Sequence, residues 1–217
     1  MSDRPVVQLV IVPHRPVHDE AELDNDLNQA FALLLRSEGL LGAYQGRKFE
    51  ELYTRVYVLL WDSLSSSHHF LISEAYDEFN TLAQQGLRGR SITWTQHAAI
   101  QASGLASMDR FNSLLTSPAI EVAWTSVKEG KVHGYLKQFD EVVRGILENE
   151  PCCDGFFISP HLEDPHNQVL LINWKSVDAH HVEFENKASF KACIDALYDY
   201  YREFVVPWHI VGLRKLA

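Results

Sequence analysis

Cysteines, long apolar runs and positive charge are all scarce in this sequence of 217 residues. Its three cysteines include the adjacent pair Cys152 and Cys153 but form no Cys-x-x-Cys motif, so we expect neither a disulfide framework nor a zinc or redox site. No apolar stretch reaches the length of a membrane span, and the N-terminal residues lack the basic start and apolar core of a signal peptide. We therefore expect a cytoplasmic protein without a membrane partner.

Lysine and arginine total 19 against 29 aspartates and glutamates, which gives a formal net charge of −10 at pH 7. Such a surface repels a phosphate backbone, so we expect no nucleic-acid partner. Glycine-rich phosphate loops, a Ser-His-Asp signature and a His-Glu-x-x-His element are missing as well. The segment 161–166 holds four potential metal ligands, but its composition is typical of a solvated acidic turn. We accordingly expect no metal and no cofactor.

The chain does contain an internal repeat. A shift of 113 residues, the separation of Trp61 and Trp174, places the Trp-Lys-Ser of 174–176 on the Trp-Asp-Ser of 61–63. Solenoid repeats are far shorter than this period. The repeat therefore indicates a whole domain that has been duplicated and fused.

Hydrophobic periodicity divides each copy into the same six elements, in the order strand, helix, strand, strand, helix, strand. In the first copy they are predicted over residues 6–12, 19–38, 43–49, 55–61, 65–85 and 91–100. In the second copy they are predicted over residues 119–127, 131–149, 155–159, 168–174, 178–204 and 205–213. This order is the split-βαβ pattern of a four-stranded antiparallel sheet with two helices on one face.

The fold class that follows is α+β, with two tandem ferredoxin-like βαββαβ units. We expect the first unit over residues 1–100, a linker over 101–118 and the second unit over 119–217. Apolar residues in the linker, at Leu105 and over 108–115, favour a short docking helix there. The bare faces of two such sheets need cover, so we expect an intrachain dimeric α+β barrel, a pseudo-dimer, in a monomer or a homodimer.

One segment of the second copy carries a family resemblance. The sequence Trp-Lys-Ser-Val-Asp-Ala-His-His over 174–181, followed by Ser189 and Phe190, resembles the antibiotic biosynthesis monooxygenase family of the dimeric α+β barrel superfamily. In that family a tryptophan closes the third strand, and a serine and an alanine open the second helix. The resemblance covers both copies and is closer in the second.

The resemblance implies a pocket between the sheet and the helices of each copy. Its members oxygenate aromatic polyketides without a cofactor or cleave haem, and relatives cyclise or decarboxylate polyketides; the fold alone does not choose among these reactions. Relatives with a histidine on the second helix often carry it nine or ten positions after the tryptophan. Here Glu183 and Phe184 hold those places, and the histidines come a turn earlier.

Paired histidines are the candidates for chemistry. Imidazole has an ordinary pKa near 6.5, which suits it to accept a proton from a phenol or from a carbon next to a carbonyl. Solvated polar residues in the first turn of a helix are the structural alternative. We expect one working site, with the second copy keeping the better motif; the catalytic candidates are His180, His181 and His68.

Aromatic residues and the remaining histidines are candidates to line the pocket and bind substrate. Tryptophan can form a pocket wall and donate its indole N–H to a ligand, although packing in the core is the simpler role. Neighbours on a strand point to opposite faces, so Trp208 and His209 cannot both enter one pocket. The substrate-binding candidates are Trp174, Trp61, Trp208, His209, His69 and Trp94.

The leading functional hypothesis is a cofactor-independent enzyme of secondary metabolism. It would remove a proton from a phenolic or polyketide-derived aromatic molecule with histidine assistance, leading to monooxygenation or to cyclisation or decarboxylation. One alternative is a protein that binds or degrades haem. The other is a small-molecule-binding or stress module without catalysis.

Overall fold

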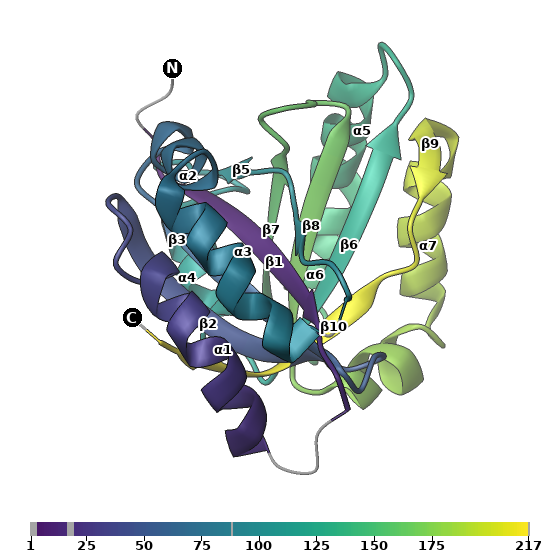
Figure 1. Ribbon diagram of the computed structural model, residues 1–217. Coiled ribbons are helices and arrows are strands. Elements are labelled where there is room, and N and C mark those ends of the chain that lie inside the picture. The colour runs from purple at the N-terminus through teal and green to yellow at the C-terminus, as the bar shows by residue number, and fades with distance from the viewer. Residues whose placement is uncertain (1–3, 17–19, 88, 217) are drawn as a thin grey trace. The chain divides into compact units, whose positions relative to one another are not determined.

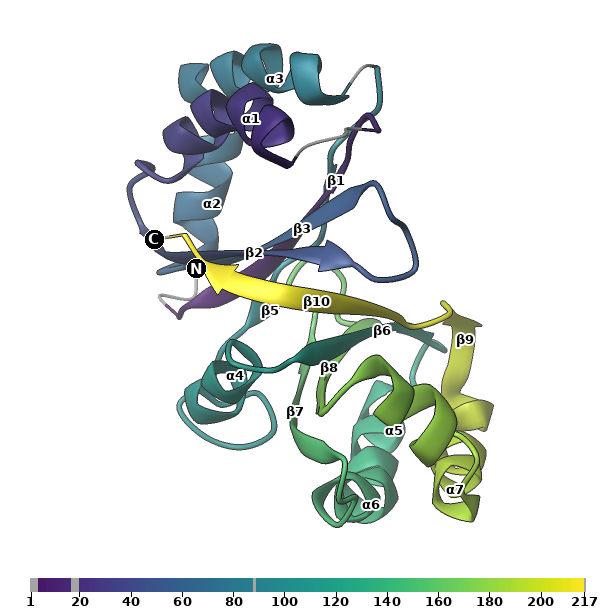
Figure 2. The ribbon, with the colours of Figure 1, turned by 90° about the horizontal axis from the view of Figure 1, so that it is seen from below.

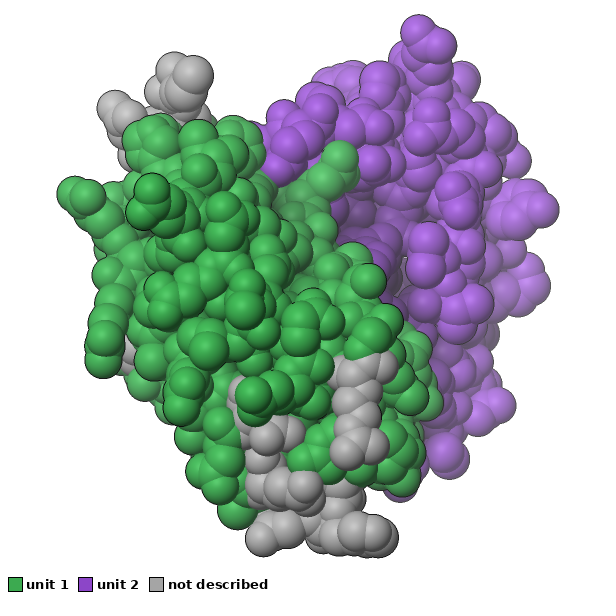
Figure 3. All heavy atoms as spheres, viewed as in Figure 1, with its two compact units in different colours: residues 1–97, 214–217 green, residues 98–213 purple. Residues whose placement is uncertain are grey.

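The computed structural model describes residues 4–16, 20–87 and 89–216, and the chain clusters into two compact units (Figures 1 and 3). The first unit comprises residues 1–97 with 214–217, and the second comprises residues 98–213. The start of the helix predicted over 19–38 lies outside the described residues. Among the described residues, no helix is long and apolar enough to cross a bilayer.

The first unit has a four-stranded antiparallel sheet in the order β4-β1-β3-β2. Helices α1 and α3 lie side by side on one face of this sheet (Figure 2). Leu23, Leu27 and Phe31 of α1 and Phe79 of α3 are buried, which matches the apolar stripe of the sequence. The elements are β1 (Val6–Pro13), α1 (Glu20–Leu34), β2 (Leu40–Lys48), β3 (Thr54–Trp61), α2 (Leu64–Leu71), α3 (Glu74–Leu87) and β4 (Thr93–Trp94).

Two predictions for the first unit need correction. The helix predicted over 65–85 is two helices, because the hydroxyl of Ser73 accepts a hydrogen bond from the backbone N–H of Tyr76 and caps a new helix start. The strand predicted over 91–100 is regular only at Thr93–Trp94 and, in the second unit, at Ala98–Ala99 (β5). The first error comes from a local cap, and at the second the Thr95 hydroxyl accepts a hydrogen bond from the backbone N–H of Leu9, a side-chain contact that apolar periodicity does not report.

The cap of α2 supports a stability prediction. The Ser63 hydroxyl accepts a hydrogen bond from the backbone N–H of Ser66 at 3.2 Å. Replacing Ser63 with alanine is expected to lower the free energy of unfolding by about 1 kcal/mol, measured by urea denaturation. Ser65→Ala, within the same helix, is the control and should change stability little. Equal losses in the two variants would contradict a capping role for Ser63.

The second unit repeats this plan, with its sheet in the order β10-β6-β8-β7. Two helical segments cover one face, and each contains a π-helical turn. The strands are β6 (Ala119–Val127), β7 (Cys153–Pro160), β8 (Asn167–Trp174), β9 (Tyr201–Phe204) and β10 (Trp208–Lys215). The helical elements are α5 (Val132–Gln138), η1 (Phe139–Val143), α6 (Arg144–Glu148), η2 (Ala179–Phe184), α7 (Ala188–Leu197) and η3 (Tyr198–Tyr200).

Strand register follows the sequence shift of 113 residues. Val6 pairs with Trp61 in the first unit, and Ala119 pairs with Trp174 in the second. The irregularity between Leu40 and Gly42 also recurs, between Cys153 and Gly155. Each unit therefore has the ferredoxin-like arrangement that the sequence predicts, with equivalent residues in equivalent places.

The helix predicted over 178–204 is wrong at its C-terminal end. Regular helix ends at Leu197, and residues 201–204 form β9, which pairs with β6. The pairing of Phe204 with Thr125 shows that tertiary contacts override the local helical pattern. This strand and the segment after it line the site described below.

The predicted linker carries the short helix that its apolar residues favour. Helix α4 (Met108–Leu114) begins at the N-cap Ser107 and is part of the second unit. Its Phe111 packs edge-on against Phe157 of β7, with ring centroids 5.7 Å apart. The helix is thereby anchored to the sheet.

Candidate active site

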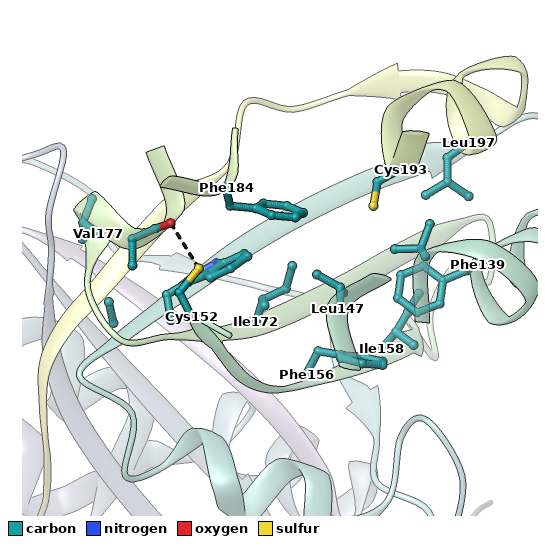
Figure 4. Close-up of a cluster of buried hydrophobic side chains, with 14 of the residues drawn as sticks. Phe139, Leu147, Cys152, Phe156, Ile158, Ile172, Val177, Phe184, Cys193 and Leu197 are labelled. Atoms are coloured by element: carbon teal, nitrogen blue, oxygen red, sulfur yellow. Dashed lines mark hydrogen bonds between the residues drawn. The ribbon is translucent and has the colours of Figure 1, made fainter. Parts of the chain in front are cut away.

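A cavity of about 280 Å³ lies between the sheet and the helices of the second unit. Figure 4 shows part of its lining, with Phe184, Cys193 and Leu197 from the helical segment 179–197 on one side and Ile172 of β8 on the other. The walls are mainly apolar, and the volume suits a small organic molecule. Its polar groups come from Glu121, His180, Glu185, Thr125, Tyr135 and Tyr201.

Glu121 and His180 meet in the wall of this cavity. The Trp174 Nε1–H donates a hydrogen bond to Glu121 Oε2 at 2.8 Å, and His180 Nε2 lies 3.3 Å from the same oxygen. The rings of Trp174 and His180 are stacked, with centroids 4.8 Å apart. Glu121 is 5% exposed and His180 is 2% exposed, so their interaction is shielded from water.

His209 completes the arrangement from the neighbouring strand. It pairs directly with Glu121 across β10 and β6, and its Nε2 lies 2.9 Å from His180 Nδ1. The network assigns a hydrogen to His180 Nε2, donated towards Glu121, and leaves His180 Nδ1 to accept from His209. Burial lowers the pKa of His180 to about 3, and the nearby imidazoles of His209 and His181 add to this effect. His180 is therefore neutral at pH 7.

The Trp-x-Ser element explains how the chain holds these groups. Trp174 ends β8 and fixes the Glu121 carboxylate, while the Ser176 hydroxyl accepts a hydrogen bond from the backbone N–H of Ala179 at 3.0 Å. That bond starts the π-helical turn η2, in which the N–H of Glu185 reaches the carbonyl of His180. Turns of this kind are frequent at functional sites, and this one places His180 over the sheet.

The other second-unit candidates are not among the residues that line the cavity. His181 has a 42% exposed side chain and its Nδ1 lies 3.0 Å from Glu185 Oε2. The Trp174 ring stacks on the ring of His180, and His209 Nε2 lies 2.9 Å from His180 Nδ1. Trp208 instead packs against Trp124. The different contacts of Trp208 and His209 agree with the alternation that the sequence predicts for this strand.

The corresponding region of the first unit has a neutral network. Gln8 and Ser67 stand at the places of Glu121 and His180, and the Ser67 hydroxyl lies 3.2 Å from Gln8 Oε1 and 2.7 Å from His97 Nε2. Phe31 stacks on Tyr57 at 3.8 Å, where the second unit has the cavity residue Leu170. An aromatic pair thus stands between this sheet and its helices.

The candidates in the first unit lie in different surroundings. His68 is exposed beside His97, and His69 lies at a polar surface hollow rich in serines. Trp61 is fully buried, and its Nε1–H has no hydrogen-bond partner among the described residues. Trp94 belongs to an aromatic cluster with Phe70 and Phe79.

Sequence reasoning missed Glu121 and Glu185. A usable signal existed for Glu121, because it is the only carboxylate in the strand Ala119–Val127 and stands between two apolar residues. Its alignment with Gln8 in the repeat pointed to a polar position that faces inward in both copies. Glu185 sits past the π-helical turn, whose irregular spacing hides its direction from a helical pattern.

Comparisons with known proteins bear on the fold and on the second unit. Residues 118–196 match the family model of antibiotic biosynthesis monooxygenases. No curated protein sequence matches the chain. Among solved structures, an anthrone oxidase-like protein aligns with a TM-score of 0.68 at 10% identity, covering 99% of this chain and 94% of its own.

Two structures named “putative monooxygenase” also align over nearly the whole chain. One, from Fusobacterium nucleatum subsp. nucleatum ATCC 25586, has a TM-score of 0.62 at 11% identity and covers 99% of this chain and 95% of its own. The other, from Lactobacillus acidophilus NCFM, has a TM-score of 0.58 at 9% identity and covers 99% and 100%. These likenesses show the tandem fold, and the family match falls on the unit that holds the cavity. Within the chain, residues 118–196 are thus similar to the antibiotic biosynthesis monooxygenase family, and the likeness to solved structures shows the fold.

Proposed function

We propose that the second unit binds a phenolic or polyketide-derived aromatic molecule in its cavity and removes a proton from it without a cofactor. The observation that supports this most directly is the buried Glu121–His180 pair in a mainly apolar wall. Buried titratable groups beside an apolar pocket are typical of sites for proton transfer. The first unit, with Gln8 and Ser67 at these places, has a structural role in this proposal.

The pair accepts the proton as a unit. His180 stays neutral because of its lowered pKa, so an ionised Glu121 leaves the pair with one negative charge and able to take up a proton. Both His180 nitrogens already face partners, Glu121 and His209, which makes Glu121 the member that meets the substrate. His180 and Trp174 then act as positioning residues that hold the carboxylate.

The substrate anion reacts next with dioxygen. For a methylene carbon between aromatic rings, loss of the proton leaves a carbanion that adds dioxygen to give a hydroperoxide. Loss of water from the hydroperoxide leaves a carbonyl, so one oxygen atom enters the product and the other leaves as water. Cyclisation or decarboxylation would begin with the same deprotonation and consume no dioxygen.

Turnover of a substrate panel tests this proposal. Chelator-treated protein is incubated with anthrones, naphthols and β-keto aromatic compounds, and oxygen uptake and products are followed by electrode and mass spectrometry. We expect at least one compound to consume one dioxygen per product, and Ala123→Phe, which fills the cavity beside Glu121, to lower kcat/KM at least about tenfold. Turnover without oxygen uptake would assign the lyase or cyclase outcome. If no compound of these classes reacts, the proposal fails.

A further inference from the structure

We propose that His180, His181 and His209 bind a single transition-metal ion on the Nδ1 side of His180. One nitrogen from each of the three rings lies within 4.8 Å of the other two. The rings are also packed on one another, with centroid distances of 4.7 Å for His180 and His181 and 4.9 Å for His181 and His209. Three converging imidazoles are a common ligand set for such ions.

The spacing is close to what coordination requires. A tetrahedral ion with Zn–N bonds of about 2.0–2.1 Å holds its ligand nitrogens about 3.3 Å apart. His180 Nδ1 and His209 Nε2 are 2.9 Å apart already. His181 is exposed and sits on the surface of η2, so its ring can move the remaining distance, roughly 1.5 Å at most, by a rotamer adjustment. Only one ligand needs to shift.

The surroundings supply the charge and the outer contacts that a metal site needs. Glu121 faces the Nε2 of His180, which is the carboxylate–histidine–metal arrangement that fixes the tautomer of a ligating ring. Glu185 lies 3.0 Å from His181 Nδ1 and 3.6 Å from His180 Nε2, so it is available as an outer contact or as a fourth ligand. Two carboxylates next to three neutral imidazoles offset the charge of a divalent ion.

Metal binding at this place changes the tautomer of His209. In the metal-free network the hydrogen on His209 Nε2 points at His180 Nδ1; coordination of both nitrogens requires that hydrogen to lie on the other nitrogen of His209. Nitrogen ligands favour Zn²⁺, Co²⁺, Ni²⁺ and Cu²⁺ over Mg²⁺ and Ca²⁺. In the first unit the sequence shift places Ser67 at the position of His180, so this set of three imidazoles is not repeated there.

This inference does not depend on the proposed reaction. His181 and His209 do not line the cavity, and turnover is assayed on chelator-treated protein, so either idea can fail alone. The test uses the full, untagged chain after chelator treatment. Zn²⁺ is titrated by calorimetry, and Co²⁺ is titrated while the visible spectrum is recorded, because tetrahedral nitrogen coordination gives Co²⁺ intense bands that the aqueous ion lacks.

We expect one Zn²⁺ bound at this site and an affinity at least about tenfold weaker in His181→Ala, whose exposed ring can be removed without disturbing the core. His133→Ala, which removes an exposed histidine of α5 outside the cluster, should bind like the parent chain. His209→Gln, checked for folding by circular dichroism, should remove the intense Co²⁺ bands. The site is refuted if His181→Ala binds as tightly as the parent chain, or if neither ion binds more tightly than about 100 µM.

Discussion

Replacing Glu121 with glutamine is expected to lower kcat/KM by about 10²–10⁴-fold, the usual range for the loss of a general base. Glutamine keeps an oxygen that can accept the hydrogen bond from Trp174, and it matches the shape of glutamate. What it loses is the negative charge and the ability to take up a proton. The measurement is the steady-state rate on whichever substrate the panel identifies, with folding checked by circular dichroism.

Glu150 provides a matched control for that substitution. It is another buried carboxylate of the second unit, paired with Lys187 at 2.7 Å, and it lies outside the cavity lining. Glu150→Gln should therefore weaken the fold, because the Lys187 charge loses its partner, yet leave kcat/KM unchanged. A Glu121→Gln enzyme that keeps its rate within about threefold would remove Glu121 from the proton transfer.

The second large effect is a loss of stability on mild acidification. The pKa of His180 is about 3 in the folded chain against an ordinary 6.5, so between these values the unfolded chain binds more protons than the folded chain. The free energy of unfolding then falls as the pH is lowered. From pH 7 to pH 5 the fall is about 2 kcal/mol, because the slope approaches 1.36 kcal/mol for each pH unit once the unfolded imidazole is protonated.

Urea denaturation of chelator-treated protein at pH 7, 6 and 5 measures this slope. In His180→Gln the slope over this range should be clearly shallower than in the parent chain, because this imidazole no longer takes up a proton on unfolding. His181→Gln alters an exposed ring and should retain the slope of the parent chain. Identical slopes in the parent chain and in His180→Gln would show that another group controls the acid sensitivity.

The two units show how one fold carries different interiors. At the shared inward position of the first strand, one unit has Gln8 within a neutral network and the other has Glu121 beside an imidazole. At another shared position the first unit has Tyr57, stacked on Phe31, where the second has Leu170 in the cavity wall. A smaller side chain at such a position leaves more room between sheet and helices.

The amino-acid sequence by itself determined the βαββαβ order, the repeat and most element bounds. These are local properties: the twofold and 3.6-fold periods mark which face of each strand or helix is buried, and they repeat wherever the domain repeats. The Trp-x-Ser element and the three catalytic candidates His180, His181 and His68 also came from the sequence, because short motifs keep their spacing along the chain.

Only the tertiary structure decided which side chains meet. Trp174 lies 53 residues from Glu121 along the chain, and no local pattern predicts that they share a hydrogen bond beside His180 and His209. The end of the last helix was set in the same way, because residues 201–204 pair with β6 instead of continuing α7. A cavity depends on the summed volumes of side chains from many segments, and that sum is defined only when the whole unit has packed.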